Sequence, residues 1–291
     1  INPPGQKFVY SDINYIMLGL LVEKLGGLPL QQYARINILD PLGMTESGYL
    51  PPDSLRPLIA PTQYDEHGNM LRGVVHDPTA RRMGGVAGHA GLFSDARDMT
   101  LYAQALLDRL KGRPSRFPLR REPLLLMITP QQPAGKAELR GLGWDIDTPY
   151  SSPRGDVFSH NSFGHTGFTG TSLWIDPDSD SYVLILTNRV HPSGGHSVVQ
   201  LRHDVATVAG RALGRSAPVE GRASGTVPGP PGGVDRLCRA GSGKPADQLL
   251  YLLGQGIAAG RDPVPFALTQ GIALRQKIAC IADFPCHFRV R

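Results

Sequence analysis

Apolar residues recur along much of the chain at the three- and four-residue spacing of amphipathic helices. Between residues 13 and 24 this spacing predicts a partly buried helix, which Ser11 or Asp12 caps and Gly26-Gly27 ends. A helix over 94–112 is expected to begin with Ser94 as its N-cap. The same pattern predicts three further helices, over residues 30–38, 122–128 and 198–213.

A glycine-rich stretch and the apolar run after it predict a β-hairpin. Glycines at 164, 167 and 170 interrupt an extended segment that continues to Asp176, and glycines in strands mark close approach of a ligand or another backbone. Residues 182–187 are rich in β-branched and aromatic side chains, and residues 176–180 between the runs supply turn chemistry. We therefore expect a hairpin whose first strand faces a substrate.

The order of these elements indicates an α+β fold, an α/β sandwich in which helices flank an antiparallel β-sheet. Two shorter strands are expected over 141–146 and 156–160. Because an amphipathic helix follows the hairpin, we expect this sheet to be covered on one face. Residues 45–90 are rich in Gly, Pro and polar residues and are expected to form loops that wall a cleft, with a turn at 65–69.

The periodic pattern ends near residue 215, which divides the chain into a domain over 1–215, a Pro/Gly linker over 216–233 and an unassigned tail over 234–291. The tail holds one convincing helical run, over 246–253, and disorder is one possibility for it. Residues 216–291 carry nine Lys or Arg and five Asp or Glu, so most of the net charge of +5 lies there. All three cysteines, Cys238, Cys280 and Cys286, lie in the tail without metal-ligand spacing. A second domain's beginning and an altered reading frame both account for this change.

Composition excludes several functional classes. No run of about 18 apolar residues occurs, so no transmembrane helix is predicted. No stripe of Lys and Arg with interleaved aromatic residues occurs, so no nucleic-acid partner is expected. The histidines show no His-Glu-x-x-His or comparable pairing, and we expect neither a metal nor another cofactor. The expected partner is a small-molecule or peptide substrate, and the oligomeric state stays open.

Two short motifs stand in an informative order. Tyr10-Ser11-Asp12 precedes the first helix, and His165-Thr166-Gly167 lies on the glycine-rich strand. Leu92-Phe93-Ser94 and Gly141-Leu142-Gly143-Trp144 lie between them. Over residues 1 to about 213, the chain resembles the serine β-lactamase and penicillin-binding protein superfamily, in the class C-like branch of D,D-peptidases, esterases and D-aminopeptidases. Members carry a Ser-x-x-Lys with the nucleophile, a Tyr-x-Asn or Ser-x-Asn, and a Lys-Thr-Gly or His-Thr-Gly.

The nucleophile motif is absent from the chain, since no serine has a lysine three positions later. The resemblance places Ser-x-x-Lys on a helix upstream of the tyrosine motif, so we expect the chain to begin after it. A serine hydrolase cannot be acylated without its nucleophile, and the chain alone is therefore expected to be inactive. The absent segment would also supply strands and the central helix, so we expect the apolar faces over 99–110 and 198–213 to be partly exposed.

The resemblance assigns roles to the first motif. Tyr10 would stand beside the nucleophile, and near the family's lysine the pKa of its phenol would fall, so that it takes the serine proton and returns it to the leaving group. The alternative is a buried tyrosine at the start of a helix. Asp12 replaces the family's Asn and cannot donate an amide N–H to a substrate carbonyl. Asp12 could instead pair with the lysine, which favours an esterase or an unusual peptidase.

The resemblance also assigns roles to the second motif. His165 would replace the lysine, hydrogen-bond toward Tyr10 and present a partial positive charge near pH 7, although a satisfied strand histidine is the alternative. Thr166 would bind a substrate carboxylate or the tyrosine, and Gly167 would keep the sheet edge open. The backbone N–H of Phe168 would supply half of an oxyanion hole. His89, in the glycine-rich loop, is a candidate cleft residue.

Two functions of different classes follow from these residues. The first is a serine hydrolase that acts through an acyl-enzyme on an ester, a D-amino acid amide or a peptidoglycan-like peptide. The second is a non-catalytic binding module that kept the fold and lost the nucleophile. Family members that act on cell-wall peptides usually work outside the cytoplasm, so the resemblance favours a periplasmic or extracellular protein.

Overall fold

The structure is a computed structural model of the 291-residue chain, and it describes residues 3, 6, 8–132, 135, 137–216 and 279–282. All of these residues belong to one compact unit. The linker beyond residue 216, the helix expected over 246–253, Cys238 and Cys286 lie outside the described residues.

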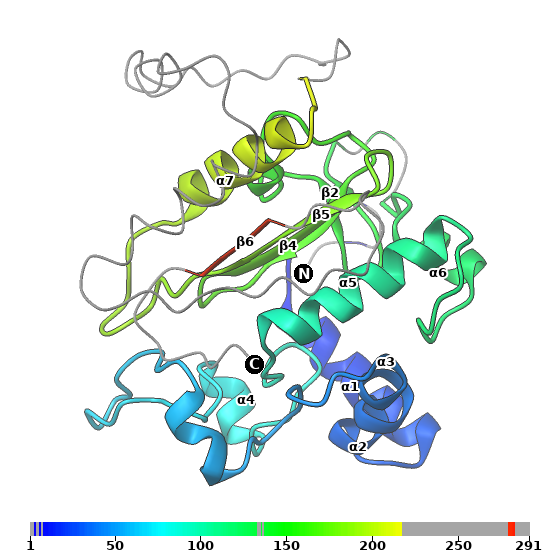
Figure 1. Cartoon of the computed structure of the whole chain (residues 1–291). Coiled ribbons are helices and arrows are strands. Elements are labelled where there is room, and N and C mark those ends of the chain that lie inside the picture. Colours follow the sequence, from blue (N-terminus) through cyan, green and yellow to red (C-terminus); the bar gives the residue numbers. More distant parts are fainter. Residues whose placement is uncertain are drawn as a thin grey trace. The chain divides into compact units, whose positions relative to one another are not determined.

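A six-stranded sheet forms the middle of this unit (Figure 1). Its strands are, in spatial order, β1 (Leu139–Arg140), β2 (Asp145–Asp147), β3 (Phe163–Thr166), β4 (Thr171–Asp176), β5 (Ser181–Leu186) and β6 (Ala279–Ala282). The first five strands are antiparallel neighbours, and β6 pairs parallel to β5. The expected antiparallel sheet is confirmed, and it gains a strand from the segment that the sequence left unassigned.

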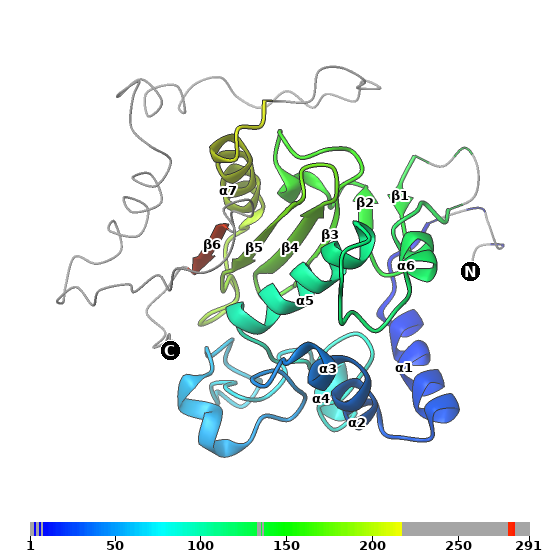
Figure 2. The same cartoon turned by 45° about the vertical axis from the view of Figure 1, so that its right-hand side comes forward.

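Helices cover both faces of the sheet, as Figure 2 shows for α5 (Ala96–Leu110) and α7 (Val199–Ala212). Side chains alternate along β5 because successive residues of a strand point to opposite faces. Tyr182 and Leu184 join the core formed with α5, and Val183 and Ile185 pack with α7. The expectation of cover on one face is therefore wrong, since β5 places buried apolar side chains on both faces of the sheet and each face needs a partner.

The expected helix over 94–112 forms, with a different cap. The side chain of Asp95 accepts a hydrogen bond from the Asp98 N–H at 2.8 Å, whereas the hydroxyl of Ser94 bonds that of Ser47 at 2.7 Å. Ala103, Leu106 and Leu107 in α5 are fully buried. The exposure expected on this face is therefore wrong for α5, because the sheet covers it.

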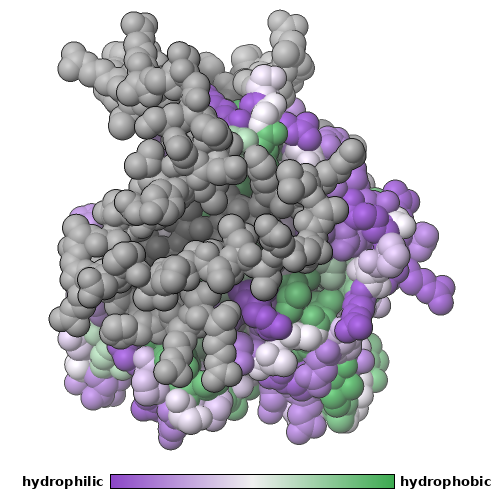
Figure 3. All heavy atoms as spheres, in the orientation of Figure 1, coloured by the Kyte–Doolittle hydropathy of each residue, from purple (hydrophilic) through white to green (hydrophobic). Residues whose placement is uncertain are grey.

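Helix α1 (Asp12–Gly26) has the exposed apolar surface instead. Only Gly19 in α1 is buried, and the expected apolar stripe is open to solvent, with Ile13 at 62 % and Met17 at 59 % exposure. Figure 3 shows hydrophobic residues at its lower right, where α1 to α3 lie.

Among the described residues no single helix is long and apolar enough to span a membrane. The helices Asp12–Gly26 and Leu30–Leu42, bent by 77° at the break between them, are together long and apolar enough, by length and composition only.

The helical segment after α1 runs past its expected end. Helix α2 (Leu30–Ala34) continues through a π-helical turn, η1 (Arg35–Leu39), into α3 (Asp40–Leu42). The wider turn allows Pro41 to sit in the first turn of a new helix, where its missing N–H is tolerated. Gly43, with φ of 71°, ends the segment.

Loops and short helices connect these elements. Short helices not expected from the sequence are η2 (Asp53–Leu58), α4 (Pro78–Arg82) and η3 (Ser152–Arg154), while α6 (Arg121–Met127) is expected. The turn at 65–69 is confirmed by a bridge between Tyr64 and Met70.

Three strand expectations are corrected. Residues 141–144 form the turn between β1 and β2, in which the Gly141 N–H donates to Trp144 O at 2.9 Å. Residues 156–160 form no strand. The glycine-rich stretch is two strands, β3 and β4, joined by a turn over 167–170, because Gly170 takes a φ of 136° that ends the extended segment.

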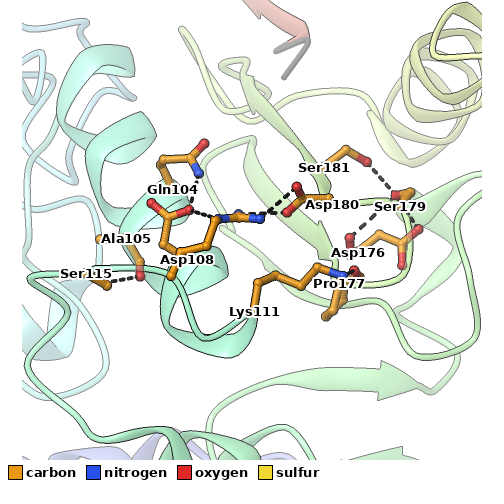
Figure 4. Close-up of polar contacts among 11 residues, drawn as sticks. Gln104, Ala105, Asp108, Lys111, Ser115, Asp176, Pro177, Ser179, Asp180 and Ser181 are labelled. Carbon is orange, nitrogen blue, oxygen red and sulfur yellow. Dashed lines mark hydrogen bonds and ion pairs between the residues drawn. The ribbon is translucent and has the colours of Figure 1, made fainter. Parts of the chain in front are cut away.

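Polar contacts join the end of α5 to the turn between β4 and β5 (Figure 4). The guanidinium of Arg113 donates two hydrogen bonds to the Asp180 carboxylate, at 2.9 and 2.8 Å, and a third to Asp108 at 2.6 Å. The Lys111 ammonium donates to Pro177 O at 3.0 Å. This arrangement fixes one end of the β4–β5 hairpin to the helix that covers it.

Candidate active site

Tyr10 and His165, which are far apart in the sequence, lie next to each other in the structure. Tyr10 lies just before α1, and His165 lies on β3, where its Cα partner across the sheet is Leu173. Their ring centroids are 6.3 Å apart, with an angle of 43° between the ring planes. The structure therefore brings together the two side chains to which the resemblance assigned catalytic roles, and those roles stay predictions.

Arg140 joins these two rings, and the sequence did not single it out. Its guanidinium lies with Cζ 5.2 Å from the centroid of the Tyr10 ring, and its Nη2 lies 2.9 Å from His165 Nε2. Nη1 forms an ion pair with Asp145, which faces Arg140 across the β1–β2 hairpin. Both Arg140 and Asp145 are buried. The available signal was a basic residue directly before Gly141-Leu142-Gly143-Trp144.

The hydrogen bonds of His165 determine its protonation. A guanidinium has only donors, so Nε2 must accept from Arg140, and Nδ1 then carries the hydrogen that it donates to Thr166 O at 2.9 Å. His165 is therefore neutral in this arrangement. Burial lowers the pKa of His165, and the charge of Arg140 lowers it further, although the bond to Thr166 O opposes both. The positive charge expected of His165 is carried by Arg140.

The phenol of Tyr10 is half exposed, and its surroundings keep it protonated. Burial raises the pKa of Tyr10, the negative charge of Asp12 raises it further, and the positive charge of Arg140 partly offsets both. The lowered pKa expected for a proton acceptor is thus absent in these surroundings. A second cation beside the phenol would act against burial and lower this pKa.

A small pocket of about 170 Å³ opens beside Tyr10. Its walls come from the segment before α1, from the first turn of α1 and from the end of β1, with Asn14 and Arg140 as polar lining residues. Asn14 stands two residues after Asp12, so an amide faces this pocket although the Tyr-x-Asn position holds an aspartate. The full lining is Phe8, Val9, Tyr10, Ser11, Asn14, Tyr15, Arg140 and Gly141.

Asp12 groups with His89 and with Asp77, a residue that the sequence did not single out. His89 Nε2 lies 2.9 Å from Asp77 Oδ1, and a donor atom of each of the three residues lies within 4.8 Å of the others. Burial raises the pKa of Asp77, but hydrogen bonds from the Ala80 N–H and from His89 outweigh burial, so the pKa is lowered. These are the described residues that could hold a metal ion. The helix cap of Asp77 and its bond to His89 account for that pair without one.

Backbone contacts place His89 beside α1. A Cβ on Gly88 would overlap the carbonyl oxygen of Tyr15, so only glycine allows the loop to approach the helix this closely. The His89 side chain is 4 % exposed, and its Nδ1 is buried without a partner among the described residues. His89 does not line the pocket beside Tyr10, and its place at a cleft stays a prediction.

The turn over 167–170 follows directly after Thr166, at the end of β3. The amide N–H of Phe168 donates no hydrogen bond among the described residues. An N–H that is to bind an oxyanion must be free in this way. The Phe168 ring is 69 % exposed, stacks on His76 at a centroid distance of 5.5 Å and lies 4.8 Å from Cζ of Arg189. The substrate roles of Thr166, Gly167 and Phe168 stay predictions.

Helices cover both faces of the sheet, and the Tyr10 phenol lies beside the His165 imidazole of β3, the strand between β2 and β4. The model of the family described as Beta-lactamase matches residues 1–207, and the chain belongs to this family. A solved β-lactamase from Mycobacterium bovis matches with a TM-score of 0.50 and 20 % identity, over 72 % of this chain and 66 % of that one. This likeness confirms the expected fold.

Proteins that are similar in sequence are named as D-alanyl-D-alanine carboxypeptidases. A protein of Salmonella schwarzengrund named "Putative D-alanyl-D-alanine carboxypeptidase" is 36 % identical over an alignment of 212 residues, and the match covers 65 % of this chain and 46 % of that protein. A protein of the same name from Salmonella paratyphi B is 35 % identical over the same shares. The chain therefore spans about half the length of these relatives.

Proposed function

We propose that this chain is the C-terminal portion of a serine hydrolase that acts through an acyl-enzyme on an ester, a D-amino acid amide or a peptidoglycan-like peptide. The observation that carries the proposal is the approach of Tyr10 and His165 to 6.3 Å beside a pocket, within a β-lactamase family fold. The relatives' name adds a D-alanyl-D-alanine terminus to the substrate classes to be tested. A periplasmic or extracellular location belongs to the same proposal.

The nucleophile is proposed to lie outside these 291 residues, because none of their serines begins a Ser-x-x-Lys. Its lysine would supply the second cation that Tyr10 requires, since Arg140 by itself leaves the pKa of the phenol raised. With that pKa lowered, Tyr10 would accept the serine proton and later protonate the leaving group. Without the nucleophile, the chain by itself is proposed to be inactive.

A fluorophosphonate probe and a penicillin probe on the intact gene product, and separately on this chain, test the proposal. We expect the gene product to be labelled at the serine of a Ser-x-x-Lys and this chain to stay unlabelled. Tyr10→Phe in the gene product should slow labelling by about 10²-fold or more, because general acid–base catalysis is lost. Tyr64→Phe is the matched control, since both tyrosines are 50 % exposed and Tyr64 lies in a different loop. Labelling of this chain alone would contradict the proposal.

A non-catalytic binding module is the second candidate. The same absence of a Ser-x-x-Lys within the chain supports it. An intact gene with Ala or Gly at the serine position, together with an unlabelled protein, would favour this candidate over the hydrolase.

A further inference from the structure

Arg202 is a buried cation whose described partners are all backbone oxygens. It lies on α7 at 4 % exposure, and its guanidinium donates to Gly167 O at 3.0 Å, Gly170 O at 3.2 Å and Thr171 O at 2.9 Å. No carboxylate pairs with it among the residues that the structure describes. Burial, with a smaller effect of Arg189, lowers the pKa of Arg202 to about 10. Burying a charge without a countercharge is costly, so the question is what the three bonds from Arg202 to this turn achieve.

One of these bonds helps to fix the direction of an amide. The Gly167 carbonyl and the Phe168 N–H belong to the same planar trans peptide group, so they point in opposite directions. Holding the Gly167 oxygen toward α7 therefore turns the Phe168 N–H away from α7. The Gly170 N–H also donates to the Gly167 oxygen, at 3.2 Å, so Arg202 is one of two donors that keep this peptide group from rotating.

Other contacts leave the same N–H free. Arg189 donates from Nη1 to Phe168 O at 3.0 Å and from its backbone N to Thr169 O at 2.8 Å. The Thr187 hydroxyl donates to Gly170 O at 2.6 Å. All five carbonyl oxygens from 167 to 171 thus have donors, and the Phe168 N–H is left without an acceptor among the described residues. A buried guanidinium on the Gly167 carbonyl also polarises that peptide group, which makes its N–H a better donor to an anion.

We propose that Arg202 is the positioning residue of the oxyanion site: it holds the Gly167 carbonyl and so aims the Phe168 N–H at the developing negative charge. Arg202 touches neither the substrate nor the reacting atoms and acts through the backbone. The inference rests on the proposed hydrolase for its catalytic consequence. Its structural consequence, the direction of one amide, holds independently.

The structural consequence is tested on this chain by selective labelling with ¹⁵N-phenylalanine, because nine phenylalanines give a sparse spectrum. The Phe168 signal is assigned by its loss in Phe168→Leu. Arg202→Met and Arg202→Lys should shift the Phe168 signal, while Arg211→Met, at an exposed position of the same helix, should leave it in place. If Arg202→Met does not fold, Arg202→Lys keeps the test. An unmoved Phe168 signal in a folded Arg202 variant would overturn the inference.

The catalytic consequence is tested on the intact gene product, with rates divided by the concentration of titrated active sites. Arg202→Met should lower kcat about 10²-fold with KM nearly unchanged, because an oxyanion donor acts mainly on the transition state. Arg202→Lys should recover part of the loss, since one ammonium can reach some of the carbonyls. A purely structural role would reduce the number of active sites and leave kcat per site intact, which would overturn the catalytic part. Absence of turnover in the unaltered gene product would instead sink the proposed function, and the amide signal would still decide the geometry.

Discussion

The two turns at the ends of β4 are both held by arginines, in different ways. At the site end, buried Arg202 donates to three backbone carbonyls of 167–171. At the other end, Arg113 binds the carboxylate of Asp180, and both side chains keep about a third of their surface exposed at 34 %. One arginine therefore fixes the conformation of a backbone, and the other fastens a turn to a helix.

This difference indicates which of the two turns at the ends of β4 depends on precise backbone geometry. Bonds to carbonyls restrain the peptide planes, and with them the amide directions, whereas a bond to a side-chain carboxylate restrains mainly the side chain. The site turn also uses Gly170 in a backbone conformation that L side chains rarely adopt, while the far turn tolerates Asp180 at a φ of 52°. We expect substitutions at the site turn to be much more costly.

Gly170→Ala should give the largest effect. A Cβ at this position would overlap the carbonyl oxygen of Thr187, and φ of 136° is strained for any L residue. We expect a loss of about 4 kcal/mol in the free energy of unfolding, from overlap and strain together. Urea denaturation measures the loss, and Gly194→Ala is a control whose added Cβ meets nothing within 4 Å, although its φ of 87° keeps the strain. Equal losses in both variants would show that overlap adds nothing.

Arg202→Met should come next, at about 3 kcal/mol. The substitution removes one donor from each of three carbonyls, which keep another donor each, and a buried polar group that is left less satisfied costs about 1 kcal/mol. The free energy of unfolding of this variant is compared with that of Arg211→Met, which should change by less than about 0.5 kcal/mol at its exposed position. A loss no greater than that of the control would remove the contrast between the two turns.

His165 should make stability depend on pH at the site end. Its folded pKa lies below the ordinary 6.5, mainly because of burial, so the unfolded chain takes up the proton first as the pH falls. The stabilising contribution of neutral His165 is complete above pH 6.5 and is lost as the pH falls from there through the folded-state pKa. Unfolding midpoints measured at several pH values should fall less steeply with falling pH in His165→Gln than in the unaltered protein.

Arg113→Met should have the smallest effect, about 0.5 to 1 kcal/mol, because partly exposed ion pairs are weak. The loss should shrink as salt is added, since screening weakens the pair in the unaltered protein. Denaturation at low and high ionic strength measures this dependence. A loss as large as that of Arg202→Met, or one independent of salt, would mean that the far turn is not the weaker anchor.

Much of the fold could be predicted from the sequence where periodicity was strong. The apolar face of α5 and the β-branched run of β5 indicated their elements, because local spacing alone decides such patterns. The turn that separates β3 from β4 was missed, since Gly164, Gly167 and Gly170 look alike in the sequence and only Gly170 of the three has a positive φ. The pairing of β6 with β5 was missed because a short strand far along the chain has no local signal of its partner.

The candidate site, too, could be predicted from the sequence only in part. Tyr10 and His165 could be selected from motif order, but Arg140, Asp145 and Asn14 could not, because their importance comes from neighbours that are distant in the sequence. Asp12 carried a motif position, yet it lies with Asp77 and His89 and does not line the pocket. The exposed face of α1 was expected to be partly buried, since amphipathic spacing indicates an apolar face and says nothing of what covers it.

By itself, the sequence determined the chemical groups of this protein: a tyrosine before a helix, a His-Thr-Gly on a strand and the alternating apolar residues that make a sheet. Only the tertiary structure decided that a buried arginine makes the histidine neutral, and that another buried arginine holds a carbonyl of the turn after β3. The physical reason is that side-chain type and spacing act locally, whereas charge state and amide direction depend on groups that folding brings within about 3 Å.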